Sequence, residues 1–143
     1  KIFFPNAKVI HCLRDAKDNC MSLYKNIFDE NQNWTYSQFD LFDYYKNYNK
    51  LMNFWKNKLP DFIYDCKYED IINEPNIQIP ELIKFCGLKW EKECMEFYNS
   101  KRAIKTVSVA QARKPLYKSS ISSSKNFNRF LEDFFNKLDN LFS

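Results

Sequence analysis

Residues 8–28 read KVIHCLRDAKDNCMSLYKNIF, and this stretch decides the fold class of the 143-residue chain. Ala7 to Leu13 (AKVIHCL) follow a turn signal and are mostly apolar, with two β-branched residues, which predicts a short buried strand. From Asp15 to Phe28 apolar side chains recur at helical spacing, so a helix is expected next, with Asp15 or Asp18 near its start. A strand that leads directly into a helix is typical of α/β proteins.

The following residues repeat this alternation of helix and strand. A long helix is predicted from about Ser37 to Leu59, with Thr35 or Ser37 as its cap and Pro60 as its stop. The segment Phe62 to Tyr68 (FIYDCKY) predicts a second strand. Strand, helix, long helix, strand and helix in this order favour an α/β layer with a parallel sheet, which is helix-rich in this chain.

Shorter elements are expected in the second half of the chain. The sequence EDIINE predicts a short helix, a second helix is expected from about Ile79 to Phe85 with Gly87 as its C-cap, and a third near Trp90 to Asn99. The region from Lys101 to Lys125 is polar and ends in the run SSISSS, so a loop is expected there, with at most a short helix around Val109 to Lys114. The serine run itself is most simply interpreted as a flexible connection.

An amphipathic helix is predicted at the end of the chain, from Asn126 to Phe142. Its polar face mixes Asp and Glu with Lys, which favours a helix packed on the core over one that lies on a membrane surface. The residues expected on its apolar face are Phe127, Phe130, Leu131, Phe134, Leu138 and Leu141.

Composition excludes several classes of protein. Apolar residues make up 45% and aromatic residues 18% of the chain, which is enough for a core and excludes a disordered tail. No apolar run approaches the roughly 20 residues of a membrane span, and no signal peptide is recognisable. The net charge of +4 comes from 22 basic and 18 acidic residues spread along the chain, so a nucleic-acid partner is not expected.

The cysteines and the single histidine predict no metal or catalytic site. The five cysteines, which are Cys12, Cys20, Cys66, Cys86 and Cys94, show no CxxC spacing and have apolar neighbours. Reduced, buried thiols of a cytoplasmic protein are therefore expected. His11 and Cys12 are neighbours on a strand and point to opposite faces, so a nucleophile–base pair is disfavoured and a structural His11 is expected.

Two residues are predicted to lie where parallel sheets bind ligands, beyond the carboxyl ends of the strands. Arg14 follows the first strand directly, and Tyr68 is expected to end the second. Ser22 lies two helical turns after Arg14, so a phosphate could receive a guanidinium fork and a hydroxyl at this place. Arg14 is one of only four arginines among the 22 basic residues. The alternatives are an Arg14 that pairs with Asp15 or Asp18 and a Tyr68 that is a core aromatic.

The three stretches that carry these residues resemble the sulfotransferase family. They are KVIHCLRDAKDNCMSLYKNIF, KYEDIINEP and IPELIKFCGLKWEKECMEFYNSKRAIKTVSVAQARKPLYKSS, and the likeness extends over about residues 4 to 121. It is greatest to the bacterial sulfotransferases that often follow tetratricopeptide repeats and to the tyrosylprotein sulfotransferases. The resemblance implies transfer of a sulfuryl group from 3′-phosphoadenosine 5′-phosphosulfate (PAPS) to a hydroxyl or amine, without a metal.

The resemblance also implies roles for individual residues. Arg14 and Ser22 match the pair that binds the 3′-phosphate of the donor, and Tyr68 matches the tyrosine that contacts the nucleotide. A Thr-x-Ser-x-x-Gln stretch with two basic residues after it closes over the nucleotide near the phosphosulfate; here it consists of Thr106, Ser108, Gln111, Arg113 and Lys114. Helix capping is the alternative role for Thr106 and Ser108.

The chain departs from the family pattern in two ways. Where the family has a Gly, a basic residue and a Trp after the KSS-type stretch, this chain has Ser122, Ser123 and Ser124, although Lys118 or Lys125 could replace the basic residue. The family's Gly-rich phosphosulfate loop, catalytic Lys or Arg and general base belong before Lys8, and one glycine in the chain cannot form such a loop. Residues 1–143 are therefore expected to be the C-terminal portion of one domain with a P-loop-type three-layer parallel sheet, inactive without the upstream loop.

Two other functions fit the same sequence. A non-catalytic remnant or adaptor would keep the fold and present its basic loop to an acidic partner. A P-loop kinase for a small molecule would share the architecture and would require an upstream GxxxxGK[ST] loop and magnesium. Neither the acceptor nor the oligomeric state is predicted by the residues.

Overall fold

The computed structural model describes residues 2–28, 32–100 and 113–141, in two compact units. The first unit comprises residues 1–13 and 61–118, and the second comprises residues 14–60 and 119–143. Each unit has its own helices or strands.

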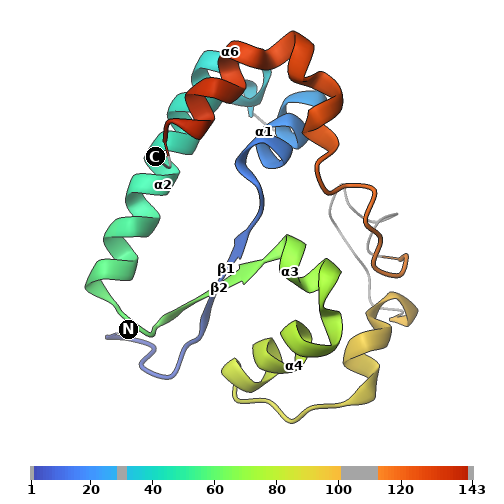
Figure 1. The fold of residues 1–143 in the computed structure, drawn as a ribbon. Coiled ribbons are helices and arrows are strands. Elements are labelled where there is room, and N and C mark those ends of the chain that lie inside the picture. Colours follow the sequence, from blue (N-terminus) through green and yellow to red (C-terminus); the bar gives the residue numbers. More distant parts are fainter. Residues whose placement is uncertain (1, 29–31, 101–112, 142–143) are drawn as a thin grey trace. The chain divides into compact units, whose positions relative to one another are not determined.

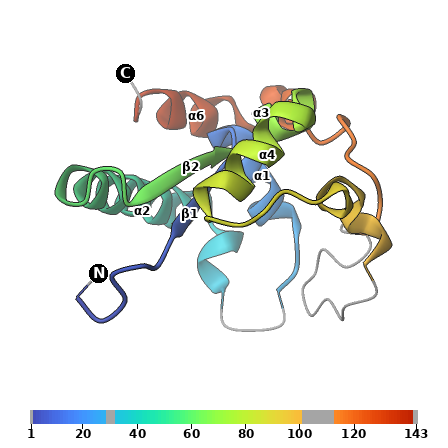
Figure 2. The ribbon, with the colours of Figure 1, turned by 90° about the horizontal axis from the view of Figure 1, so that it is seen from below.

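The first unit contains a parallel pair of strands. β1 (Val9–Leu13) pairs with β2 (Ile63–Lys67) in a register that runs from Val9 opposite Ile63 to Leu13 opposite Lys67. Figures 1 and 2 both show the two strands side by side. The parallel pairing confirms the α/β expectation, in a small sheet of two strands among the described residues.

Among the described residues of the first unit, three helical segments follow β2. They are α3 (Tyr68–Asn73), α4 (Pro75–Phe85) and the 3₁₀ helix η2 (Lys92–Asn99). α4 begins earlier than expected because Pro75 is favourable in the first turn, where its missing N–H is not needed. Gly87 follows α4 at φ +71°, which confirms it as the residue that ends the helix. The α-helix expected near Trp90 to Asn99 is instead 3₁₀.

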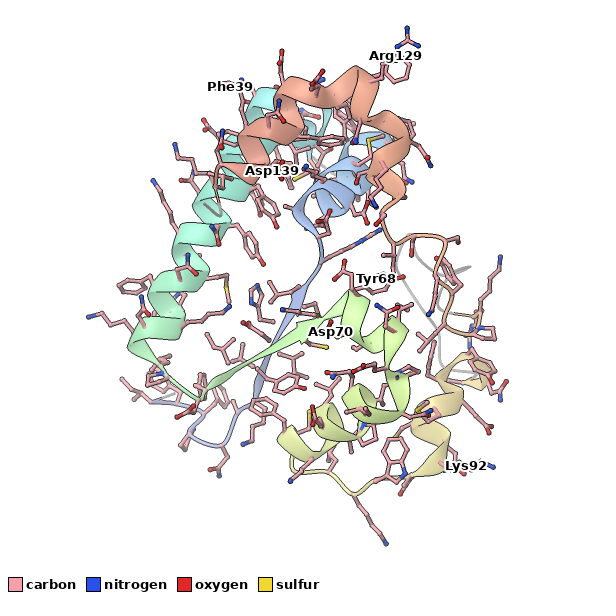
Figure 3. The ribbon with its side chains drawn as sticks, in the orientation of Figure 1. Phe39, Tyr68, Asp70, Lys92, Arg129 and Asp139 are labelled. Carbon is pink, nitrogen blue, oxygen red and sulfur yellow. The ribbon has the colours of Figure 1, made fainter. Side chains whose placement is uncertain are left out.

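Tyr68 differs from its expected place at the end of the second strand. It is the first residue of α3, and β2 ends one residue earlier at Lys67. The β-compatible composition of FIYDCKY misplaces this boundary because Glu69 and Asp70 favour the first turn of a helix, where carboxylates oppose its positive end. Figure 3 shows Tyr68 at the start of α3.

The second unit is a helical cluster. It contains α1 (Ala16–Lys25), the 3₁₀ helix η1 (Asn33–Tyr36), α2 (Gln38–Lys58), the 3₁₀ helix η3 (Ser123–Phe127) and α6 (Asn128–Asp139). The caps predicted from the sequence are confirmed, because Asp15 accepts from the backbone N–H of Asp18 and Ser37 from that of Asp40. α1, α2 and α6 pack on one another (Figure 1).

The core of the second unit is formed by the facing sides of these three helices. Its buried members are Cys20, Met21, Leu41, Tyr45, Leu131, Phe134, Phe135 and Leu138. The terminal helix packs on the core as expected, but its apolar face differs from the predicted one. Phe130 is 76% exposed, because it lies before the irregular backbone at Leu131 (φ −128°, ψ 24°), whereas Phe135 is 2% exposed, because it lies one regular turn after Leu131 on the same face.

The cysteines were expected to be buried, and this prediction is wrong for three of them. Cys20 and Cys66 are buried, Cys86 and Cys94 are partly exposed, and Cys12 is exposed on β1. Apolar neighbours in sequence did not predict burial here, because the place of each residue in the fold decides its exposure: Cys12 lies on the largely exposed strand β1, Cys86 at the C-cap of α4 and Cys94 in η2.

Candidate functional site

Arg14 links the carboxyl end of β1 to the start of α1. It follows Leu13, the last residue of the strand, and precedes Asp15, the N-cap of the helix. Its Nη2 donates a hydrogen bond to the carbonyl oxygen of Ser120 at 2.8 Å. A guanidinium carries its N–H donors in a rigid planar fork, so the bond to the Ser120 carbonyl orients the whole group.

The serine run 119–124 forms an ordered turn around a buried carboxylate, that of Asp18. Asp18 is 1% exposed and lies in the first turn of α1. Its Oδ2 accepts from the backbone N–H of Ser122 at 2.6 Å, and its Oδ1 accepts from that of Ser124 at 2.7 Å. The hydroxyl of Ser123 adds a longer bond to Oδ1 at 3.4 Å. The interpretation of the serine run as a flexible connection is therefore wrong.

The electrostatics of Asp18 favour its ionised form. Burial by itself raises the pKa of a carboxyl, but the hydrogen bonds from the backbone and side chain of Ser124, the backbone bond from Ser122 and the nearby charge of Arg14 outweigh it. The pKa of Asp18 is therefore lowered below its ordinary value of 3.8. At neutral pH the turn is organised by a full negative charge.

The backbone at Ser122 is left-handed. Ser122 has φ 58° and ψ 22°, a conformation that glycine adopts without steric cost and that other residues rarely adopt. The turn is therefore constrained at this residue.

Ser22 lies on α1, in the same unit as Arg14. It is partly exposed, and its carbonyl oxygen accepts a hydrogen bond from Nδ2 of Asn26 at 2.7 Å. This contact belongs to the end of the helix and does not involve the hydroxyl, which is the group expected to contact a phosphate.

Tyr68 and Lys114 line one pocket in the first unit, with a volume of about 190 Å³. The other lining residues are Ile72, Phe97, Pro115, Leu116 and Tyr117. Three aromatic rings, aliphatic groups and one ammonium are the chemistry that a flat heteroaromatic base with an attached phosphate requires. Phe97 and Tyr117 lie in the third stretch that resembles the sulfotransferases, but no role was predicted for either residue from the sequence.

Three of the predicted site residues, Thr106, Ser108 and Gln111, lie outside the described residues. The expected helix around Val109 to Lys114 lies largely outside them as well. Arg113 is described and exposed. The structure therefore places Arg14 and Ser22 in one unit, and Tyr68, Arg113 and Lys114 in the other.

His11 has a structural partner, in agreement with expectation. Its Nδ1 lies 2.9 Å from Oδ1 of Asp65, the residue directly opposite it in the β1–β2 register. His11 is buried whereas its neighbour Cys12 is exposed, as alternation along a strand requires. The two side chains do not form a nucleophile–base pair.

Within the described residues, no group of three or more His, Cys, Asp or Glu side chains could hold a metal ion. In the same part of the chain, no helix combines the length and the apolar character that crossing a membrane requires.

A sequence profile described as the sulfotransferase family matches residues 1–92. The chain belongs to the sulfotransferase family. The matched residues include Arg14, Ser22 and Tyr68, whereas Thr106 to Lys114 follow the match. An uncharacterized protein of Aquifex aeolicus (strain VF5) is 35% identical over 133 residues, which is 91% of this chain. The chain spans only 18% of the length of that relative.

Proposed function

We propose that this sulfotransferase family chain provides the nucleotide side of a PAPS site, with Arg14 and Ser22 binding the 3′-phosphate. The observation that carries the proposal is the Arg14 guanidinium, held by the Ser120 carbonyl at the end of a parallel strand. Ligands of α/β sheets bind beyond the carboxyl ends of the strands, and an arginine fork is suited to a phosphate dianion.

Tyr68 and Lys114 are proposed to bind the nucleoside part of the same donor, in the pocket that they line. Stacking on an aromatic ring is favourable for adenine, and an ammonium is favourable for a phosphate oxygen. Thr106, Ser108, Gln111 and Arg113 complete the donor site in this proposal, on the strength of the family motif alone.

The reaction proposed for the whole protein is sulfuryl transfer. The oxygen or nitrogen of an acceptor forms a bond to sulfur, the bond between sulfur and the 5′-phosphate oxygen breaks, and 3′-phosphoadenosine 5′-phosphate leaves. The acceptor proton passes to a general base outside this chain's predicted residues. Arg14 and Ser22 do not touch the sulfur in this scheme; they bind and orient the donor, and no catalytic residue is assigned here.

Residues 1–143 are proposed to form the C-terminal part of a single domain with a P-loop-type three-layer sheet. Val9 and Ile10 of β1 are 36% and 40% exposed, although parallel sheets in α/β proteins are covered on both faces. The single glycine, Gly87, is engaged at the end of α4, so a Gly-rich phosphosulfate loop has to come from elsewhere in the protein. The proposed subtype is that of the bacterial repeat-linked and tyrosylprotein sulfotransferases.

The test is calorimetric titration of the full-length protein with 3′-phosphoadenosine 5′-phosphate and with adenosine 5′-phosphate. We expect the first to bind more tightly, and Arg14→Ala to lower this preference by about 10- to 100-fold, because a charge-assisted hydrogen bond contributes about 1.5–3 kcal/mol. Arg129→Ala is the matched control and should leave the preference unchanged. Arg129 lies on α6, and its side chain points away from that helix (Figure 3).

Three outcomes would contradict the proposal. A wild-type protein that binds both nucleotides equally, or neither, would favour a non-catalytic remnant of the fold. An Arg14→Ala variant that weakens both nucleotides equally would remove Arg14 from the 3′-phosphate site. A requirement for magnesium in binding would instead favour a kinase.

A further inference from the structure

A buried carboxylate next to a proposed phosphate ligand requires a physical reason, because its charge opposes that of the phosphate. Asp18 is such a group, since it is 1% exposed and lies four residues after Arg14 in the chain. Both of its oxygens accept hydrogen bonds from the turn 119–124, so its negative charge is stabilised by backbone N–H groups. A buried charge that is fully hydrogen-bonded fixes the groups around it.

The same turn supplies the oxygen that holds Arg14. Ser120 accepts from Arg14 through its carbonyl oxygen at 2.8 Å, and Ser122 and Ser124, which donate to Asp18, follow within four residues. The turn is also constrained from within, because Ser122 adopts a left-handed conformation. The contacts therefore form a chain from Asp18 through the turn to the guanidinium.

We propose that Asp18 is a positioning residue, which fixes the serine turn so that the Ser120 carbonyl orients the Arg14 guanidinium for the 3′-phosphate. This inference rests on the proposed function. Arg14 has a long side chain with many rotamers, so holding it in one orientation before binding increases its affinity for a phosphate. Because its pKa is lowered, the Asp18 carboxylate is ionised at neutral pH and accepts both hydrogen bonds of the turn as an anion.

The variant that tests the inference is Asp18→Asn in the full-length protein, because Asn keeps the size of the side chain but cannot accept from both N–H groups. We expect the preference for 3′-phosphoadenosine 5′-phosphate over adenosine 5′-phosphate to fall about tenfold, which corresponds to about 1.4 kcal/mol. The matched control is Asp133→Asn, an exposed aspartate of α6, which should leave the preference unchanged. A merely structural role would lower the thermal midpoint and leave the preference of the folded protein as it was.

A second pair of variants tests the same contacts without changing the charge of Asp18. Ser122→Gly suits the left-handed backbone and should retain the preference, whereas Ser122→Val strains it and should lower the preference. This pair decides the matter if Asp18→Asn does not fold. Ser122 is exposed, so its side chain contributes little to the core.

The outcomes separate this inference from the proposed function. If Arg14→Ala abolishes the preference while Asp18→Asn and Ser122→Val retain it, Asp18 does not position Arg14 and only the inference is wrong. If the wild-type protein shows no preference for the 3′-phosphate, the proposed function is wrong and the inference falls with it. A loss in Asp18→Asn and Ser122→Val with retention in Ser122→Gly supports both.

Discussion

The carboxylate of Asp18 accepts a hydrogen bond at 2.7 Å from the backbone N–H of Ser124, a residue 106 positions later in the chain. With the bond to Ser122, it fastens the segment before α6 to the first turn of α1. Such bonds are stronger than neutral ones because the acceptor is ionised, and they are costly to break because the donors are left buried.

Asp18→Asn should therefore destabilise the protein by about 3 kcal/mol at pH 7, within the range for breaking a buried charged interaction. Urea denaturation followed by tryptophan fluorescence measures the change. Asp133→Asn is the control and should stay within about 0.5 kcal/mol of wild type, as exposed positions do. An equal, small effect of both substitutions would show that the Asp18 contacts contribute little.

The pH dependence of stability gives Asp18 a signature of its own. Because the folded-state pKa is lowered, the contribution of Asp18 is complete above the ordinary value of 3.8 and is lost as the pH falls through the lowered value. In an acid titration of the free energy of unfolding, Asp18→Asn should lack this component while Asp133→Asn retains it. Parallel acid profiles for wild type and Asp18→Asn would contradict the assignment.

Glycine at position 122 should stabilise the protein or leave its stability unchanged. A non-glycine residue in the left-handed region costs about 1–2 kcal/mol, and the extra backbone entropy of glycine offsets about 0.5–1 kcal/mol of the gain. Ser123→Gly is the control, because Ser123 lies within η3, and it should destabilise by about 0.5–1 kcal/mol. Thermal midpoints of the two variants test the contrast, and an equal loss of stability in both variants would show that Ser122 is not left-handed.

The terminal helix offers a test of its register. Phe135→Ala should cost about 3–5 kcal/mol, because Phe135 is buried in the core, whereas the exposed Phe130→Ala should cost less than about 0.5 kcal/mol. The two substitutions remove the same atoms from the same helix, so a difference between their losses of stability must come from the burial of the two side chains. A larger loss for Phe130→Ala in denaturation experiments would restore the register expected from periodicity alone.

Cys20 should be inert to thiol reagents in the folded protein. Burial, with a smaller effect of the Asp15 charge, raises the pKa of its thiol to about 12. About one molecule in 10⁴ would then carry the reactive thiolate at pH 8. Iodoacetamide labelling with peptide mass spectrometry should modify Cys20 only in urea, and rapid labelling without urea would contradict its burial.

Local sequence predicted the elements whose signals are local. Ser37 and Pro60 bound α2 because a cap and a helix breaker act on their own neighbours, and β1 follows from its apolar run. Arg14 was predicted at the strand end for the same reason. Periodicity over residues 126–142 predicted a helix but could not predict the irregular backbone at Leu131, after which the buried face follows Leu131, Phe135 and Leu138 and leaves Phe130 exposed.

The serine turn could not be predicted from its own residues. A run of serines favours a flexible connection, and what orders it is a carboxylate more than 100 residues earlier. Tyr68 illustrates a smaller error, since strand propensity continues through it although helix α3 begins there. The pocket partners Phe97 and Tyr117 are brought to Tyr68 and Lys114 by packing, for which no motif is a guide.

The most direct test of the account is a crystal structure of the full-length protein with 3′-phosphoadenosine 5′-phosphate bound. We expect the 3′-phosphate within hydrogen-bonding distance of the Arg14 guanidinium and the Ser22 hydroxyl, with Arg14 still bonded to the Ser120 carbonyl. A 3′-phosphate that contacts neither Arg14 nor Ser22 would show that these residues do not bind the donor.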